Sequence, residues 1–320
     1  MIRYVIKRIV WLVPVIIAVS FIVFGLMELA PGTVVDAMFS DEMTMEDRQA
    51  LIERYNLDKP MIYRYGLYMV NLIQGDLGTY DTTGADVWRE FLRRLPNTLL
   101  LSFSALIIGS VIALPLGIIA ARKAGTLTDN AVTVFSLVGM SMPLFWLGLL
   151  LLLLFAQQLQ WLPSGGFDAG LRSLILPAFC SSFTLMANAA RQTRSNMLEV
   201  LKADYLRTAR AKGVPEKVVI RKHALGNAWI PIITAIGSSL SVQLAGSVVI
   251  EQVFAWPGIG RMAADAVRAR DVTAATGVVI MTSILYVIVQ LIVDMLYAFV
   301  DPRIKAQYIR PSKKKVKRAA

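Results

Sequence analysis

Long apolar runs alternate with shorter polar segments along almost the whole chain. A helix needs about 20 mostly apolar residues to cross the hydrocarbon core of a membrane. Six runs reach or nearly reach that length: Ile9–Leu29, Thr98–Ala121, Ala131–Ala156, Leu174–Ala190, Ala228–Ile250 and Thr273–Val293. Helices are expected, because an open sheet cannot satisfy its backbone polar groups in lipid. The pattern predicts an all-α polytopic membrane protein with six transmembrane helices.

The largest polar segment lies between the first two apolar runs and carries three amphipathic stretches. In "TMEDRQALIERYNLD" Thr44 is the expected N-cap, with Asp47 at the third position of the helix. A second helix is expected to begin at Pro60 and to end within "GDLG". "DVWREFLRRLP" forms the third, before Pro96 turns the chain into the second span. The segment is too short for an independent catalytic domain, so we expect a small helical cap with a structural or docking role.

Composition and charge support a membrane protein with a defined orientation. The chain is 56% hydrophobic, which would expose too much apolar surface in a soluble domain, and its net charge is +11. With the N-terminus inside, the inner segments 1–8, 122–130, 191–227 and 294–320 hold 22 of the 33 lysines and arginines. This positive-inside asymmetry predicts a multi-pass protein of the bacterial inner membrane with both termini in the cytoplasm. The positive charge then faces membrane lipid rather than nucleic acid.

Four parts follow from this pattern. Residues 1–30 form the N-terminal tail and a first span that we expect to stay uncleaved, and residues 31–97 form the extracytoplasmic cap. Residues 98–300 form a five-helix core that includes the inner loop 191–227, and residues 301–320 form a basic cytoplasmic tail.

The inner loop concentrates positive charge between two apolar runs. Its central part, Lys202–Asn227, predicts a short helix that Gly213 ends. One narrow face of that helix carries small and apolar side chains, namely Ala203, Leu206, Ala209 and Gly213. Arg207 and Lys212 lie away from this face. Physical reasoning leaves two interpretations open: a helix onto which a partner docks closely, or an ordinary positive-inside loop.

The sequence "DYLRTARAKGVPEKVVIRKHALGN" resembles the cytoplasmic coupling loop of permeases from binding-protein-dependent ABC importers, in the oligopeptide, dipeptide and nickel branch. Ala209, Gly213 and Leu225 match the general family pattern. Four residues stand where that pattern has Glu, Ala, Ile and Pro, namely Arg207, Thr208, His223 and Gly226. These departures are similar to the version of the motif found in the peptide branch.

The resemblance extends over nearly the whole chain. Further segments similar to the branch are "LDKP", "GDLG", "RLPNTL", "SMPLFWLG", "QWLPSGG", "RSNMLEVL", "EQVFAWPGIGR" and "LIVDMLYAFVDPRI". One departure is "APGTVV" at Ala30–Val35, where the branch more often has Pro-Gly-Asp-Pro. So many segments in the same order make the resemblance specific.

The resemblance implies mechanical coupling to ATP hydrolysis in other chains. The residues implied in contact with an ATPase are Ala203, Asp204, Tyr205, Leu206, Arg207, Thr208, Ala209, Arg210, Ala211, Lys212 and Gly213. The implied partners are a second homologous permease, two cytoplasmic ATPase subunits and an extracytoplasmic substrate-binding protein. Di- or oligopeptides are the first choice of cargo, and nickel or a nickel chelate, glutathione and oligosaccharides remain alternatives.

No catalytic or metal chemistry is expected in this chain. The sequence lacks the G-x-x-x-x-G-K-[ST] loop that cradles phosphate, so ATP and Mg²⁺ are expected on the partner ATPases and no cofactor is expected here. His223 is the only histidine, and it favours a structural or docking contact over catalysis. A secondary transporter would usually carry carboxylates near mid-span, and none is found there. A channel remains possible but would leave the inner loop unexplained.

Several polar residues in and near the spans allow two interpretations each. The candidates for lining a translocation pathway are Ser141, Asn188, Ser239 and Gln243, which could instead form hydrogen bonds between helices. Glu251 together with Trp256-Pro257-Gly258 predicts either an outer gate or a fixed structural turn.

Overall fold

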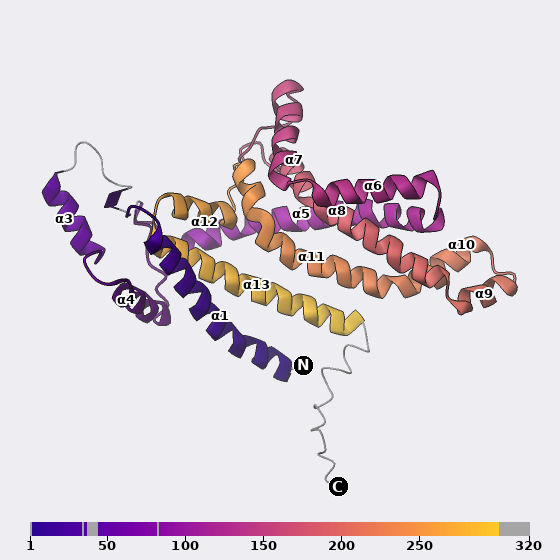
Figure 1. Ribbon diagram of the computed structural model, residues 1–320, viewed down its shortest axis with the longest axis horizontal. Helices are drawn as coiled ribbons and strands as arrows, with labels where there is room; N and C mark the ends of the chain where they lie inside the picture. The colour runs from indigo at the N-terminus through magenta and orange to yellow at the C-terminus, as the bar shows by residue number, and fades with distance from the viewer. Residues whose placement is uncertain (1, 34, 37–43, 82, 301–320) are drawn as a thin grey trace, which may run out of the picture.

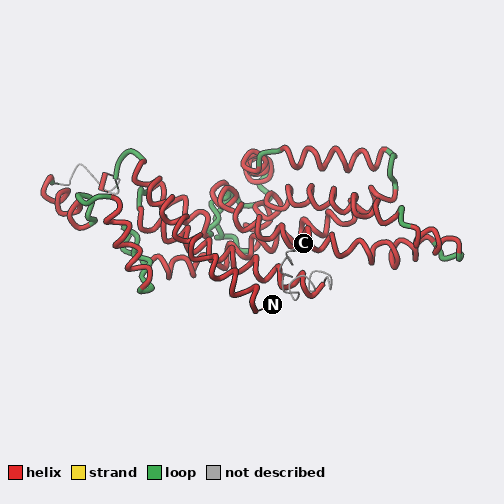
Figure 2. Tube along the Cα trace, turned by 60° about the horizontal axis from the view of Figure 1, so that its bottom comes forward, coloured by secondary structure: helices red, strands yellow, loops and turns green. Residues whose placement is uncertain are grey.

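The computed structural model describes residues 2–33, 35–36, 44–81 and 83–300. Within these ranges the chain consists of helices joined by short loops, and its only β-type pairing is a single bridge between Thr79 and Asp86 (Figure 2). The predicted basic tail 301–320 lies outside the described residues. The mostly helical class predicted from the sequence is confirmed.

The helices form an elongated molecule with small helical units at both ends (Figure 1). The bounds are α1 Ile2–Leu29, α3 Met45–Arg54, α4 Met61–Ile73, α5 Val87–Arg122, α6 Leu127–Ser141, α7 Leu144–Leu151, the π-helical η1 Leu152–Gln158, α8 Leu171–Leu201, α9 Asp204–Ala211, α10 Glu216–Val218, the π-helical η2 Val219–Ala224, α11 Leu225–Val253, α12 Ile259–Arg268 and α13 Val272–Val300. The end with α3 and α4 lies opposite the end with α9 and α10, and the long helices run between them.

Four helices in the described chain are long and apolar enough to cross a membrane. The segments that meet this test are Val5–Leu29, Val87–Arg122, Leu171–Leu201 and Val272–Leu296. The α8 segment is far more enclosed by protein than the α1 segment, because α8 packs against α5, α6 and α11 whereas α1 lies mainly along α13. In α11 the qualifying apolar part, Pro231–Leu240, is shorter.

The predicted third span, Ala131–Ala156, is wrong as a single straight helix. The chain forms α6 and then α7 continuing into η1, and the two parts are bent by 101°; α7 stands upright against the rest of the molecule in Figure 1. Pro143 causes the break, because a proline disfavours helical backbone in the preceding residue, and Met142 is extended at ψ 124°. If the bent pair counts as one span, the total rises to five.

Small residues bring α5 and α8 into close contact. A Cβ on Gly117 of α5 would lie 2.6 Å from the carbonyl oxygen of Ala190 and 2.6 Å from Cβ of Thr193 on α8. Such close approach suits helices in a membrane, where van der Waals packing rather than water exclusion drives association. The α5–α8 pair thus forms the spine against which α6 and α11 pack.

The predicted cap segment follows the expected helices with one correction. The side chain of Thr44 accepts a hydrogen bond from the backbone N–H of Asp47, and the side chain of Asp47 accepts one from the backbone N–H of Thr44. The predicted N-cap of α3 is therefore confirmed. Pro60 precedes α4 as expected. The predicted turn at Pro96 is wrong, because α5 runs straight through it. Buried Phe91 before the proline and buried Thr98 after it hold the helix in register, so packing overrides the lost backbone hydrogen bond.

Candidate functional site

The inner loop forms a compact unit at the end of the molecule opposite the cap. After α8 ends at Leu201, the short helix α9 follows, and a turn at Gly213 leads through α10 and η2 into α11. Gly213 has φ +76°, the left-handed conformation that glycine adopts without strain, as the predicted helix end requires. Across this turn Arg210 forms two hydrogen bonds of 3.0 Å to the carboxylate of Glu216. The ion pair helps to set the angle between α9 and α10.

Two of the four residues on the predicted docking face of α9, Leu206 and Ala209, pack against the protein's own interior, whereas Ala203 is half-buried and Gly213 is exposed. Leu206 is fully buried in a cluster with Met197, Val219 and Ile232, and Ala209 packs against the same cluster. Leu206 is one of the few large apolar residues in the loop, and burial against the ends of α8 and α11 removes it from water. Leu206 is therefore a packing residue rather than a contact for a partner, and the role of the other face residues in docking stays a prediction.

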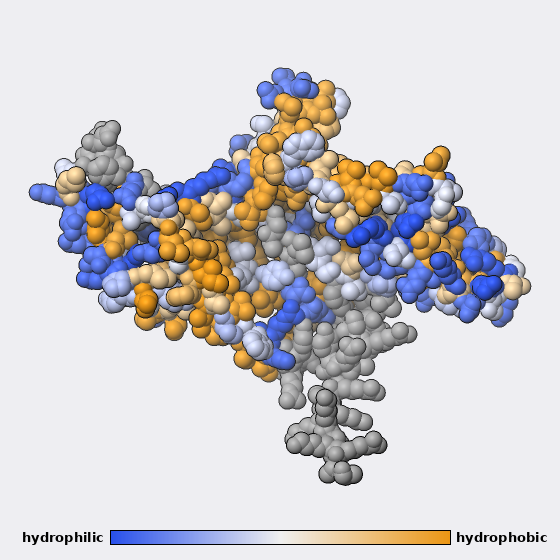
Figure 3. Space-filling view, viewed as in Figure 1, coloured by the Kyte–Doolittle hydropathy of each residue, from blue (hydrophilic) through white to orange (hydrophobic). Residues whose placement is uncertain are grey.

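The opposite side of α9 is open to solvent. Its exposed residues are Asp204, Tyr205, Arg207, Thr208, Arg210 and Ala211, and the exposed Lys212 follows. Tyr205 is 44% exposed although it is a large aromatic residue. Figure 3 shows hydrophilic surface gathered at this end of the molecule, beyond the hydrophobic surface of the long helices. This end can present an aromatic side chain with flanking positive charge to another protein.

An ion pair with a buried carboxylate connects α8 to the α5–α6 hairpin, and sequence reasoning missed it. Asp129 in the first turn of α6 is 2% exposed. Its carboxylate accepts two hydrogen bonds from the guanidinium of Arg194 on α8, one of them 2.8 Å long, and a third from the backbone N–H of Gly125 at 2.9 Å. Asp129 and Arg194 are far apart in the sequence and meet only because α6 packs against α8.

The candidate pathway residues do not converge on one described cavity. Gln243 of α11 donates to the carbonyl and the hydroxyl of Ser181 on α8, so it joins two helices. Asn188 and Ser239 each bond a carbonyl of their own helix, and Ser141 lies at the exposed end of α6. The role of these four residues in lining a pathway stays a prediction.

The segment Glu251–Gly258 forms a tightly bonded turn at the C-terminal end of α11. Glu251 is fully buried, and its carboxylate accepts hydrogen bonds from the hydroxyl of Thr98 at 2.7 Å and from the backbone N–H of Arg261 at 2.9 Å. The indole N–H of Trp256, also fully buried, donates to the carbonyl of Asn97 at 3.0 Å. These bonds join the turn to α5 and to the start of α12. The geometry favours the fixed structural turn over a mobile gate.

Gly258 and Gly260 allow this close packing. A Cβ on Gly258 would overlap the carboxylate of Glu251. A Cβ on Gly260 would lie 2.7 Å from Cα of Val248 on α11 and 3.0 Å from a carboxylate oxygen of Glu251. The glycines of the "PGIG" segment are thus needed where the α12 backbone meets α11.

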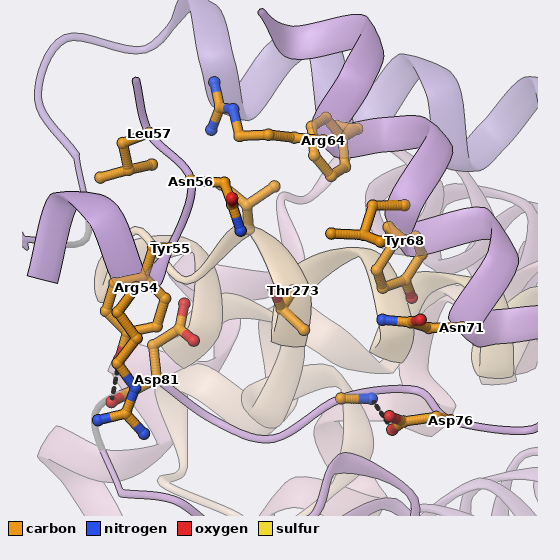
Figure 4. A pocket seen from close by; sticks show the side chains of 14 residues that line it. Arg54, Tyr55, Asn56, Leu57, Arg64, Tyr68, Asn71, Asp76, Asp81 and Thr273 are labelled. Carbon is orange, nitrogen blue, oxygen red and sulfur yellow. Dashed lines mark hydrogen bonds between the residues drawn. The ribbon is translucent and has the colours of Figure 1, made fainter. Parts of the chain in front are cut away.

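A pocket of about 200 Å³ lies where the cap meets α13 (Figure 4). Arg54, Arg64, Asn56, Tyr68 and Thr273 contribute side chains from α3, the α3–α4 loop, α4 and α13. The hydroxyl of Tyr68 is buried and lacks a hydrogen-bond partner among the described residues. The pocket combines both signs of charge with apolar walls.

Two carboxyl groups meet beside this pocket. The backbone N–H of Asp81 donates to Oδ2 of Asp271 at 2.7 Å, and Oδ1 of Asp271 accepts from the N–H of Ala274 at 2.8 Å in the first turn of α13. Burial and the negative charge of Asp271 raise the pKa of Asp81 to about 7. Burial likewise raises the pKa of Asp271. The pair joins the cap to the start of α13.

The helical architecture and the apolar spans define a multi-pass membrane protein. Residues 113–306 match the family model described as "Binding-protein-dependent transport system inner membrane component". The chain belongs to this family.

Curated relatives align with nearly the whole chain. The oligopeptide transport system permease protein AppB of Bacillus subtilis (strain 168) is 38% identical over 95% of this chain and 100% of its own length. The di/tripeptide permease protein DppB of Pseudomonas aeruginosa (strain UCBPP-PA14) is 38% identical over 96% and 100%. The dipeptide permease protein DppB of Escherichia coli (strain K12) is 34% identical over 95% and 99%.

Solved structures show the same fold at lower sequence identity. A chain of the MetNI methionine ABC transporter in an inward-facing conformation superposes with a TM-score of 0.56 at 21% identity, covering 66% of this chain and 96% of that chain. A chain from an amino acid ABC transporter gives 0.53 at 18% identity, covering 67% and 94%. The fold is therefore that of the membrane-spanning part of an ABC transporter.

Proposed function

We propose that this chain is the permease subunit of an ATP-driven importer for di- and oligopeptides and forms half of the translocation pathway. The observation that carries the cargo assignment is identity of 34–38% over at least 95% of the chain with three permeases whose names specify peptides. The binding-protein-dependent family supports the importing direction. ATP hydrolysis takes place in partner chains, so the subunit itself is not an enzyme and holds no cofactor.

Six spans cross the membrane in this proposal. They are α1, α5, the bent α6–η1 pair, α8, α11 and α13. Both termini and α9 lie in the cytoplasm, and α3, α4 and α12 lie outside. The positive-inside charge asymmetry supports this orientation, and so do the opposite positions of the cap and α9 in Figure 1.

The solvent side of α9 couples the permease to a cytoplasmic ATPase. Tyr205 inserts between ATPase side chains, and Arg207 and Lys212 meet acidic residues around it. Buried Leu206 anchors α9 to the ends of α8 and α11, so a displacement of α9 is passed to both long helices. Two such permeases pair, two ATPases bind ATP and Mg²⁺ beneath them, and the binding protein delivers cargo at the cap.

Uptake by the reconstituted importer tests the cargo. The permease pair, its ATPases and the binding protein are placed in liposomes, and ATP-dependent uptake of labelled dipeptide, oligopeptide, nickel, glutathione and oligosaccharide is measured. We expect uptake of peptide alone. Uptake of another cargo without peptide would overturn the assignment.

Retention of the ATPase tests the docking side. Reversing the charge of Arg207 and Lys212 to Glu should weaken ATPase retention in a pull-down, most clearly at low salt, because exposed ion pairs are screened as salt rises. Lys59→Glu at the opposite end of the molecule is the matched control. Equal retention by all variants at low salt would leave the basic residues as topology signals.

A further inference from the structure

A strongly basic pocket lies at the outer end of the molecule, separate from the pocket of Figure 4. Its volume is about 400 Å³. It is lined by Arg93, Arg94 and Asn97 of α5 and by Pro257, Arg261 and Asp265 of the α11–α12 turn and α12. Three of the six lining residues are arginines. Like charges this close repel one another, so such a cluster favours a bound anion.

The pocket walls are held in place by the bonded turn around Glu251. The side-chain amide of Asn97 donates to the carbonyl of Pro257 at 2.9 Å, and the carbonyl of Asn97 accepts from the indole of Trp256. One residue further, Thr98 accepts from the N–H of Ile259 at 2.9 Å. The helices that carry the arginines are therefore joined by a buried bond network. A site whose walls are already positioned loses less entropy when a ligand binds.

The charges in the pocket do not balance. Glu90 accepts from Arg93 at 2.7 Å and from Arg94 at 2.6 Å through the same oxygen. Asp265 pairs with Arg261 at 3.6 Å and also with Arg268 at 3.7 Å. Four guanidinium groups thus share two carboxylates, which leaves a net positive charge. Each guanidinium has five N–H donors. These contacts, together with the hydrogen bond from Arg261 to the carbonyl of Ala255, leave several of the donors unused. The free donors suit a planar anion that accepts two hydrogen bonds at once.

We propose that this pocket binds the terminal carboxylate of a peptide as it passes from the binding protein into the permease. The inference rests on the proposed peptide cargo and on the outer location of α12. A carboxylate is the anion that unmodified peptides share whatever their side chains, and its negative charge offsets positive charge that Glu90 and Asp265 leave unbalanced. The site recognises the C-terminal end of the peptide and makes no selection among peptide side chains.

Direct peptide binding tests this site in the complete permease–ATPase complex without the binding protein, held in nanodiscs. The probes are labelled Ala-Phe and its C-terminal amide, and the readout is equilibrium binding. The wild type should bind the free acid about tenfold more tightly than the amide, the loss expected for charge-assisted hydrogen bonds. Arg93→Gln and Arg261→Gln together should weaken acid binding about tenfold and leave amide binding unchanged.

Arg89→Gln is the matched control, since Arg89 is an exposed arginine one turn earlier on α5 and outside the pocket lining. Arg94 is kept because Glu90 depends on it. The single change Arg93→Gln guards against misfolding, because that side chain is 74% exposed. It should reduce acid binding on its own.

Equal binding of acid and amide by the wild type, absence of binding of either, or an unchanged acid affinity in the double variant would overturn the inference. Weakening of acid and amide to the same extent would also overturn it, since it would indicate a change in pocket shape. Failure of the proposed function gives a different result: the complete importer with its binding protein then takes up no peptide even as wild type.

Discussion

Gly260→Ala perturbs the junction of α11 and α12 at its narrowest point. The added Cβ would lie 2.7 Å from Cα of Val248, which is about 1 Å closer than an ordinary van der Waals contact. Because Cα of Val248 is a backbone atom, it cannot move aside by a side-chain rotation. The start of α12 must then move away from α11, which lengthens the 2.9 Å hydrogen bond from the N–H of Arg261 to the carboxylate of Glu251. Overpacking costs about 1–3 kcal/mol and the lost bond to a buried carboxylate about 1.5–3 kcal/mol. We expect a total of about 3–5 kcal/mol.

Thermal unfolding in detergent measures this loss, and the chain supplies its own reporter. Cys180 is the only cysteine and is fully buried, so a thiol-reactive dye reports its exposure on unfolding. Gly260→Ala should lower the midpoint by at least about 5 °C. Gly226→Ala is the matched control, because nothing lies within 4 Å of its Cβ and alanine favours a helix. Equal midpoints for Gly260→Ala and wild type would refute the reasoning.

Three further predictions concern the inner loop and the cap. Asp129→Asn should remove about 2 kcal/mol, measured by the same dye assay, because Arg194 loses a largely buried partner; an unchanged midpoint would contradict this. Gly213→Val should lower peptide uptake per ATP hydrolysed in proteoliposomes while insertion persists, because φ +76° strains any branched residue; normal coupling would mean that α9 is misassigned. Because the pKa of Asp81 is raised to about 7, the native state holds a proton that the unfolded chain releases above about pH 4, so stability should fall as pH rises towards 7. Asp81→Asn should flatten this slope in midpoints measured across that range, and a slope that persists would count against the carboxyl pair.

The helical class and several helix ends could be predicted because they depend on local sequence. Apolar runs of sufficient length predicted the long helices. Thr44 and Asp47 predicted the start of α3, and Gly213 predicted the end of the segment that contains α9. Each of these signals acts within a few residues. The family resemblance was confirmed by the family match over residues 113–306 and by a relative that is 38% identical over 95% of this chain.

The features that sequence reasoning missed depend on contacts between distant segments. The break at Pro143 and the continuous helix through Pro96 show that a proline has opposite outcomes in different packing environments. Leu206 was predicted to be part of a docking face. Helical periodicity shows which residues share a face of α9, but it does not show that the ends of α8 and α11 bury that residue. The pairing of Asp129 with Arg194 likewise requires the crossing of α6 and α8.

The most direct test of the account is to tag this chain, extract it gently from its native membrane and identify the co-purifying proteins by mass spectrometry. We expect two ATPase chains and a second permease, with peptide on any binding protein that accompanies them. A chain that comes out alone and moves solute in liposomes without ATP would contradict the central claim and indicate a channel or a secondary carrier.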